Sequence, residues 1–164
     1  MRDVPDFPAA GVLFRDITPV LQDGHLLRDL VRHLAARYEA SRLDAIAAIE
    51  ARGFIFGAAV AAQLGVGFVP IRKPGKLPHH TTRVEYTLEY GTDCIEVHED
   101  AFQPGQRILV LDDLLATGGT AAAAVELVRL AGAEAVGAAF LIELSFLHGR
   151  ARLEGLDTWS LLAY

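Results

Sequence analysis

The chain has 164 residues, of which 52% are hydrophobic and 22% charged, with 15 basic and 21 acidic side chains. This length is typical of one domain with a buried core, and the apolar fraction excludes an intrinsically disordered chain. A formal net charge of −6 argues against a general nucleic-acid-binding or anionic-membrane surface. The single cysteine cannot form an intrachain disulfide, which favours a reducing, cytoplasmic location.

The most apolar stretch, residues 54–71, reaches the lower length limit of a membrane span, since its only polar side chain is Gln63. Several glycines and a proline interrupt it, and much of the remainder is alanine. A buried helix over about 54–64, followed by a buried strand over 67–71, explains the stretch better than a span. We also expect no secretory signal, because residues 1–8 lack an apolar segment.

The remaining pattern alternates strands with helices, beginning with an apolar stripe that predicts a helix over residues 26–38. The other predicted elements are a buried strand over 44–50, a strand over 107–111, a helix over 121–131 and a strand over 135–142. Helices of about eleven residues between strands are typical of right-handed crossovers in a parallel sheet. We therefore predict an α/β fold with a central, mainly parallel sheet and helices on both faces, in a single domain over residues 1–164.

Residues 72–103 break this pattern, because they are polar and alternate in hydrophobicity on both sides of a Tyr-Gly-Thr-Asp turn at 90–93. Such alternation predicts an antiparallel hairpin with one exposed face. We interpret residues of about 73–100 as a flap over a site. The alternative is a decoration at the edge of the sheet.

The most informative segment covers residues 108–120, where a buried strand leads into two acids, a Thr-Gly-Gly-Thr loop and a helix. The glycines allow backbone N–H groups to face one point, the threonine hydroxyls add donors, and the helix N-terminus favours an anion. The loop lacks the Gly-Lys-Ser/Thr of a Walker loop. Asp112 and Asp113 would repel a phosphate unless they bind sugar hydroxyls or a divalent metal. The alternative is that Asp113 is a surface acid and Thr120 a helix N-cap.

This segment resembles the phosphoribosyl diphosphate (PRPP) binding motif of the type I phosphoribosyltransferase family. Five further motifs, in order along the chain, make it similar to the members of that family that act on adenine. The six motifs are Val-Pro-Asp-Phe-Pro (4–8), Phe-Arg-Asp-Ile-Thr-Pro (14–19), Glu-Ala-Arg-Gly-Phe (50–54), Arg-Lys-Pro-Gly-Lys-Leu-Pro (72–78), Leu-Glu-Tyr-Gly-Thr-Asp (88–93) and Asp-Asp-Leu-Leu-Ala-Thr-Gly-Gly-Thr (112–120). The sequence departs from the family at His79-His80, where a glycine-containing segment is usual, and begins without the family's short first helix.

The resemblance implies an enzyme of purine salvage, a pentosyl-transferring glycosyltransferase that converts adenine and PRPP to AMP and diphosphate. It also implies the type I fold, a base-binding hood over about residues 1–20, and a homodimer. Mg²⁺ would be the cofactor, held mainly by PRPP and water rather than by dedicated protein ligands. The alternatives are a non-catalytic sensor of PRPP or nucleotide, and a phosphoribosyltransferase for another purine or a pyrimidine.

The family's binding residues transfer to this sequence in three groups. The 5′-phosphate and ribose of PRPP would bind Asp112, Asp113, Ala116, Thr117, Gly118, Gly119 and Thr120. The diphosphate would bind Arg52, Gly53, Arg72, Lys73 and Lys76. The only two lysines of the chain lie in this last group, which supports a ligand role over a solvated basic turn.

The third group handles the base. Adenine would bind Leu13, Phe14 and Arg15, with Phe14 stacked on the purine and the backbone of Arg15 at its edge. Without the resemblance, Phe14 is as readily interpreted as a core aromatic. Glu89 would exchange a proton with the purine, Tyr90 would help seal the site, and Arg52 would assist catalysis beside them.

Overall fold

A parallel sheet of five strands forms the centre of the computed structural model, which describes residues 1–7, 9–87 and 91–164. The strands follow the order β4-β3-β7-β8-β9 across the sheet. Their bounds are β3 (Ala45–Ile49), β4 (Gly67–Ile71), β7 (Arg107–Leu115), β8 (Glu134–Glu143) and β9 (Thr158–Ala163). The predicted parallel sheet is confirmed, and all its strands end at the same edge.

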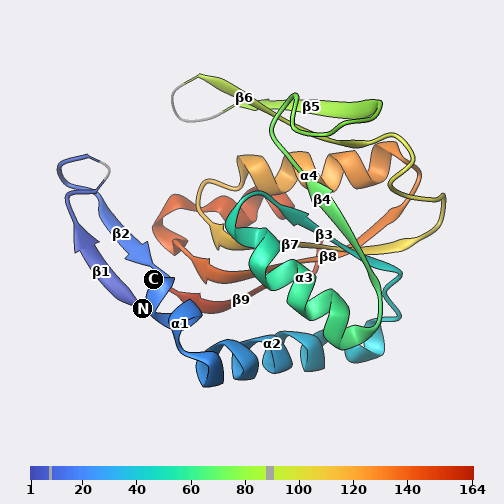
Figure 1. Ribbon diagram of the computed structural model, residues 1–164. Coiled ribbons are helices and arrows are strands. Elements are labelled where there is room, and N and C mark those ends of the chain that lie inside the picture. The colour runs from blue at the N-terminus through green and yellow to red at the C-terminus, as the bar shows by residue number, and fades with distance from the viewer. Residues whose placement is uncertain (8, 88–90) are drawn as a thin grey trace.

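Helices cover both faces of this sheet, as predicted (Figure 1). They are α1 (Thr18–Gln22), α2 (Gly24–Tyr38), α3 (Arg52–Leu64) and α4 (Gly119–Leu130). Successive residues of a strand face opposite sides, so Ile46 packs with α2 and α3 while Ala47 packs with α4. Because both sides are covered, β3 is buried along its whole length. None of the described helices is long and apolar enough to cross a membrane.

The predicted flap is an antiparallel hairpin of β5 (Thr81–Thr87) and β6 (Thr92–His98). Its alternating apolar residues point to α4 and belong to the same core as that helix. The hairpin therefore packs over α4 rather than extending the central sheet at an edge (Figure 1). An isolated bridge between Arg72 and Glu96 connects it to the segment that follows β4.

The N-terminal hood contains a second antiparallel hairpin, of β1 (Arg2–Pro5) and β2 (Leu13–Asp16). The backbone N–H of Gly11 donates to the Asp6 carboxylate at 2.7 Å within the connecting loop. This hood hairpin projects from the body of the molecule, and the C-terminal end of the chain lies beside its base (Figure 1).

Several elements differ from the sequence predictions, and two of the differences affect the residues predicted for the site. β7 continues to Leu115, so Asp112 and Asp113 lie inside the strand instead of after it. α3 begins at Arg52, which therefore opens a helix rather than sitting in a loop. β9 was not predicted; it adds the edge strand beside β8.

Candidate active site

A short glycine loop, residues 116–118, joins β7 to α4 at the carboxyl edge of the sheet. Gly118 has a φ of +80°, a conformation that favours glycine, and α4 begins at the next residue. The first backbone N–H groups of a helix have no acceptor inside it, so those of α4 face the loop. Residues 114–121 and Asp112 line a cavity of about 70 Å³ there. The residues predicted to form an anion cradle thus line one small cavity, Thr117 and Thr120 among them.

A second glycine, Gly149, packs directly against the backbone of this loop, and no pattern in the sequence indicates it. Gly149 opens η3 (Gly149–Leu153), a 3₁₀ turn between β8 and β9. A Cβ atom on Gly149 would lie 2.1 Å from the Ala116 carbonyl oxygen, and one on Gly118 would lie 2.2 Å from the Gly149 carbonyl oxygen. Two backbones therefore touch without side chains between them. Nothing local distinguishes Gly149 from an ordinary turn glycine, because the constraint is tertiary.

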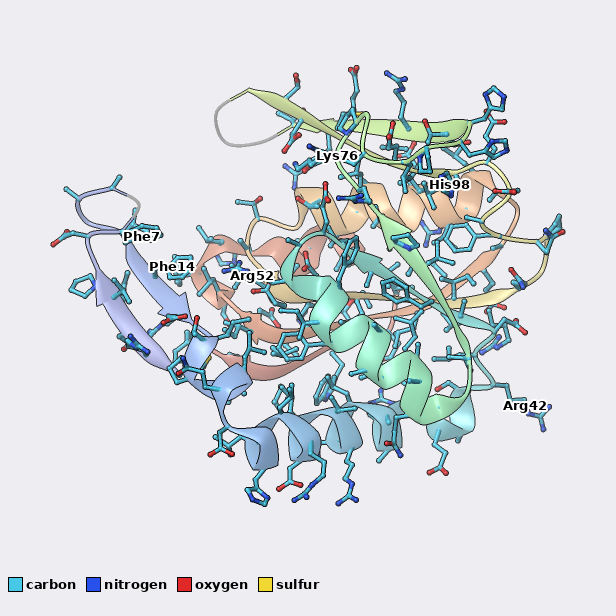
Figure 2. The ribbon with its side chains drawn as sticks, in the orientation of Figure 1. Phe7, Phe14, Arg42, Arg52, Lys76 and His98 are labelled. Carbon is cyan, nitrogen blue, oxygen red and sulfur yellow. The ribbon has the colours of Figure 1, made fainter. Side chains whose placement is uncertain are left out.

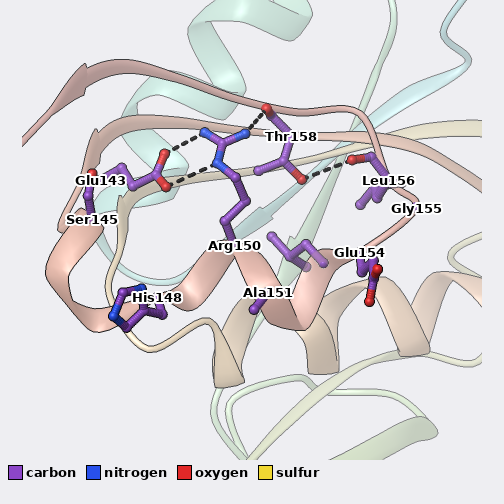
Figure 3. Close-up of a pocket in the computed structure, with 10 residues that line it drawn as sticks. Glu143, Ser145, His148, Arg150, Ala151, Glu154, Gly155, Leu156 and Thr158 are labelled. Atoms are coloured by element: carbon purple, nitrogen blue, oxygen red, sulfur yellow. Dashed lines mark hydrogen bonds and ion pairs between the residues drawn. The ribbon is translucent and has the colours of Figure 1, made fainter.

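An ion pair at the end of β8 fixes the segment that carries Gly149. The Arg150 Nε donates to Glu143 at 3.1 Å, and the Ser160 hydroxyl donates to the same carboxylate at 2.8 Å. The hydrogen bond from Arg150 holds the pKa of Glu143 below its usual value. Figure 3 shows Arg150 between Glu143 and Thr158, beside a cavity of about 640 Å³. None of the residues predicted for the site lines this larger cavity.

The two adjacent acids are held tightly at the end of β7. Asp113 is only 5% exposed, and its Oδ2 lies 2.8 Å from the Nε of Arg52. Asp112 Oδ1 accepts a hydrogen bond of 2.8 Å from the Asp113 backbone N–H. Burial raises the pKa of Asp112 well above its usual value, and the charge of Asp113 adds to the shift. Burial also raises the pKa of Asp113, although Arg52 opposes it.

Gly53 permits this arrangement, because a Cβ there would lie 2.8 Å from the Oδ1 of Asp112. The start of α3 can therefore approach the acids closely. Arg52 and Gly53, predicted from the sequence as diphosphate ligands, are thus brought directly to the acid pair. The interpretation of Asp113 as a surface acid is wrong.

The basic segment after β4 is organised by Glu50, a residue that the sequence analysis did not assign. The Glu50 carboxylate accepts from the Arg72 Nε at 2.9 Å and from the Lys73 backbone N–H at 2.6 Å. Burial raises the pKa of Glu50, but these two hydrogen bonds outweigh it and lower the pKa overall. Arg72 also donates to the Lys76 carbonyl oxygen at 2.9 Å.

The three predicted cations of this segment therefore have different surroundings. The Arg72 guanidinium is paired with Glu50. The Lys73 ammonium is paired with Asp93 of β6 and lies 3.2 Å from the hydroxyl of Tyr86 in β5. Lys76 is exposed. Figure 2 shows Lys76 below the flap hairpin.

The hood brings its aromatic residue toward the acid pair. Phe14 belongs to neither apolar core of the described residues, so the interpretation as a core aromatic is wrong. Its ring packs edge-on against Phe7, with centroids 5.2 Å apart, and the Arg52 guanidinium carbon lies 5.5 Å from its centroid. Figure 2 shows Phe7, Phe14 and Arg52 in a row from the hood hairpin towards α3. Leu13 is exposed, and Arg15 packs against Tyr164.

Glu89 and Tyr90, predicted as the proton-handling and sealing residues, lie outside the described residues. Their neighbours on the flap are described: a Cβ on Gly119 would lie 3.2 Å from the Thr87 carbonyl oxygen. The end of β5 thus packs directly on the start of α4.

A parallel sheet with an acid pair, a glycine loop and a helix N-terminus at its carboxyl edge is an arrangement suited to a phosphorylated sugar. The family model of the phosphoribosyl transferase domain matches residues 20–158, and the chain belongs to this family.

The most similar relatives carry a more specific name. An adenine phosphoribosyltransferase from Roseiflexus sp. (strain RS-1) is 56% identical over 100% of this chain and 95% of its own length. The crystal structure of adenine phosphoribosyltransferase from Thermoanaerobacter pseudethanolicus has a TM-score of 0.97 at 53% identity, covering 99% of this chain and 95% of that one. The enzyme from Saccharomyces cerevisiae, complexed with an imino-altritol bisphosphate and adenine, has a TM-score of 0.94 at 39% identity, covering 98% and 93%.

We expect Gly149→Ala to weaken the binding of ribose 5-phosphate about tenfold or more, because the new methyl group must displace the glycine loop. Isothermal titration calorimetry measures this. Gly24→Ala is the matched control, since a Cβ there meets nothing within 4 Å and it should leave binding unchanged. Unaltered affinity in folded Gly149→Ala would contradict the role of this contact.

We expect Asp112→Asn to raise the melting temperature at pH 8 by roughly 2–4 °C while lowering kcat/KM. A carboxyl whose pKa is raised on folding loses stability as the pH rises through that pKa, so the neutral amide gains most above it. The gain should shrink at pH 5, where wild-type Asp112 is itself more protonated. Melting curves at both pH values measure this, and an equal gain at both would contradict it.

Proposed function

We propose that this protein transfers the 5-phosphoribosyl group of PRPP to adenine, giving AMP and diphosphate in purine salvage. The observation that carries the proposal is that one edge of the sheet holds an anion loop, an acid pair and Arg52 in contact with a hood aromatic. These parts match, in order, a phosphate, a ribose, a diphosphate and a base. The names of the most similar relatives support adenine as that base.

The 5′-phosphate would bind the glycine loop and the start of α4, which offer backbone N–H groups and two threonine hydroxyls. Its negative charge complements the positive end of the helix. The ribose hydroxyls would donate to Asp112 and Asp113. The same carboxylates would stabilise the positive charge that develops at the anomeric carbon.

The diphosphate would leave toward Arg52 and Gly53. Arg52 uses its Nε on Asp113, and among the described residues its two terminal nitrogens have no hydrogen bond, so they can bind phosphate oxygens. Lys76 is exposed and can approach from solvent. Arg72 and Lys73 would have to exchange their carboxylate partners for the diphosphate, since both are paired.

The reaction forms a bond between a purine nitrogen and the anomeric carbon as the carbon–oxygen bond to diphosphate breaks, with inversion. The electron pair of that bond leaves with the diphosphate. The proton on the reacting nitrogen passes to Glu89 in our assignment. Closure by the flap, in which the resemblance gives Tyr90 a sealing role, would keep water from the anomeric carbon.

Mg²⁺ is the cofactor we assign, and the donor set fits a metal held mostly by substrate. No group of three metal-ligating side chains occurs among the described residues. Asp112 and Asp113 offer the oxygen ligands that Mg²⁺ prefers. Bound Mg²⁺ would neutralise charge on the diphosphate. We further propose a cytoplasmic location, which the single cysteine favours, and a homodimer, which the family resemblance implies.

The decisive experiment supplies the purified protein with PRPP, Mg²⁺ and one of four bases: adenine, hypoxanthine, guanine or xanthine. We expect AMP from adenine and little product from the 6-oxopurines, which present a different edge to the hood backbone. Preference for a 6-oxopurine would overturn the base assignment. Binding of PRPP without any turnover would instead indicate a non-catalytic sensor.

We expect Glu89→Gln to lower kcat about 10²-fold or more, because an amide cannot accept the proton, while the KM for PRPP changes little. Steady-state kinetics with each substrate varied in turn measure this. Glu85→Gln, on the exposed side of β5 in the same hairpin, is the matched control and should keep the wild-type rate. An unchanged kcat in Glu89→Gln would remove this residue from the mechanism.

A further inference from the structure

The guanidinium of Arg15 lies over an aromatic ring from a distant part of the chain. Its central carbon is 4.0 Å from the centroid of the Tyr164 ring. Arg15 also pairs with Asp3, its cross-strand partner in the hood hairpin. The side chain of Arg15 is 19% exposed, although it lies on a projecting hairpin. It is therefore held between the hairpin and Tyr164.

Tyr164 itself is anchored to the central sheet. Its backbone N–H donates to the Glu143 carbonyl oxygen at 2.9 Å, and its carbonyl oxygen accepts from the Ser145 backbone N–H at 2.8 Å. These bonds fix Tyr164 at the carboxyl end of β8, the edge of the sheet that holds the glycine loop. The Tyr164 ring is consequently held in a fixed position, and Arg15 of the hood hairpin packs against it.

The hood is thus held on both of its faces. Neighbouring residues of a strand point to opposite sides, so Phe14 and Arg15 of β2 face different surroundings. Phe14 meets Arg52 at 5.5 Å, and Arg15 meets Tyr164 at 4.0 Å. The backbone between these two side chains is the part that we assign to the edge of the base.

We propose that Tyr164 is a positioning residue for base recognition, which it serves by fixing the Arg15 guanidinium and, through it, the backbone of β2. This inference rests on the proposed function and extends it to a residue far from the base in sequence. Tyr164 acts through Arg15. Substitution of Tyr164 should therefore weaken binding of the base and leave binding of the phosphate unchanged, because the glycine loop packs against Gly149 and not against Tyr164.

The test compares AMP with ribose 5-phosphate, two ligands that differ by the base alone. In Tyr164→Ala we expect calorimetry to give an AMP Kd about threefold to tenfold higher, the range for loss of a cation–aromatic contact. Ribose 5-phosphate should bind as in wild type. The KM for adenine should rise while the KM for PRPP stays constant.

Two further variants separate the effect of the aromatic ring of Tyr164 from the effect of its volume. Tyr164→Phe keeps the aromatic face and should restore AMP binding, whereas Tyr164→Leu keeps apolar bulk and should behave like Tyr164→Ala. Equal weakening of both ligands, or full AMP affinity in Tyr164→Leu, would overturn the proposal. Failure of the proposed function is distinguishable, because wild-type protein would then prefer another purine in turnover. The same series with that purine's nucleotide would still test Tyr164.

Discussion

The site depends on two backbone segments that approach too closely for any side chain to fit between them. Gly118 ends the turn after β7, and Gly149 opens η3 between β8 and β9. A Cβ on Gly118 would overlap the carbonyl of Gly149, and a Cβ on Gly149 would overlap the carbonyl of Ala116. The anion loop is therefore fixed by the connection between two other strands, and not by its own sequence. Donors that are held in place before the ligand arrives need no reorganisation when it binds.

The acid pair beside this loop is unfavourable for the stability of the folded protein. Asp113 is buried and Asp112 is half-buried, with Arg52 as the cation beside Asp113, and desolvation raises the pKa of both carboxyls. Buried charge is unfavourable unless it is paired and hydrogen-bonded, so the pair destabilises the folded protein in the absence of a ligand. Hydroxyl groups of a bound ribose would supply the missing donors. The carboxylate oxygens that destabilise the folded protein are therefore the same atoms that we propose to bind the ribose.

Sequence periodicity was enough to predict the parallel sheet and the flap hairpin, because each has a clear hydrophobic pattern. The turn from β7 to α4 was predictable from its Thr-Gly-Gly-Thr motif. Periodicity failed at the hood hairpin, whose strands of four residues are too short for a pattern, and at β9, a partly exposed edge strand. It also ended β7 too early, since Asp112 and Asp113 are polar residues inside a strand. Glu50 and Gly149 were missed because only tertiary contacts give them a role.

The three parts of the proposed ligand are held with unequal firmness. The part of the site assigned to the phosphate is formed by backbone packed on backbone. The part assigned to the ribose consists of two carboxylates at the end of a central strand. The part assigned to the base, by contrast, lies on a projecting hairpin whose side chains contact Arg52 and Tyr164. Arg52 belongs to both regions, because it pairs with Asp113 and faces Phe14. A diphosphate that draws Arg52 toward itself would therefore change the surroundings of Phe14, the ring that we propose to stack on the base. Such a change would couple the two substrates through one side chain.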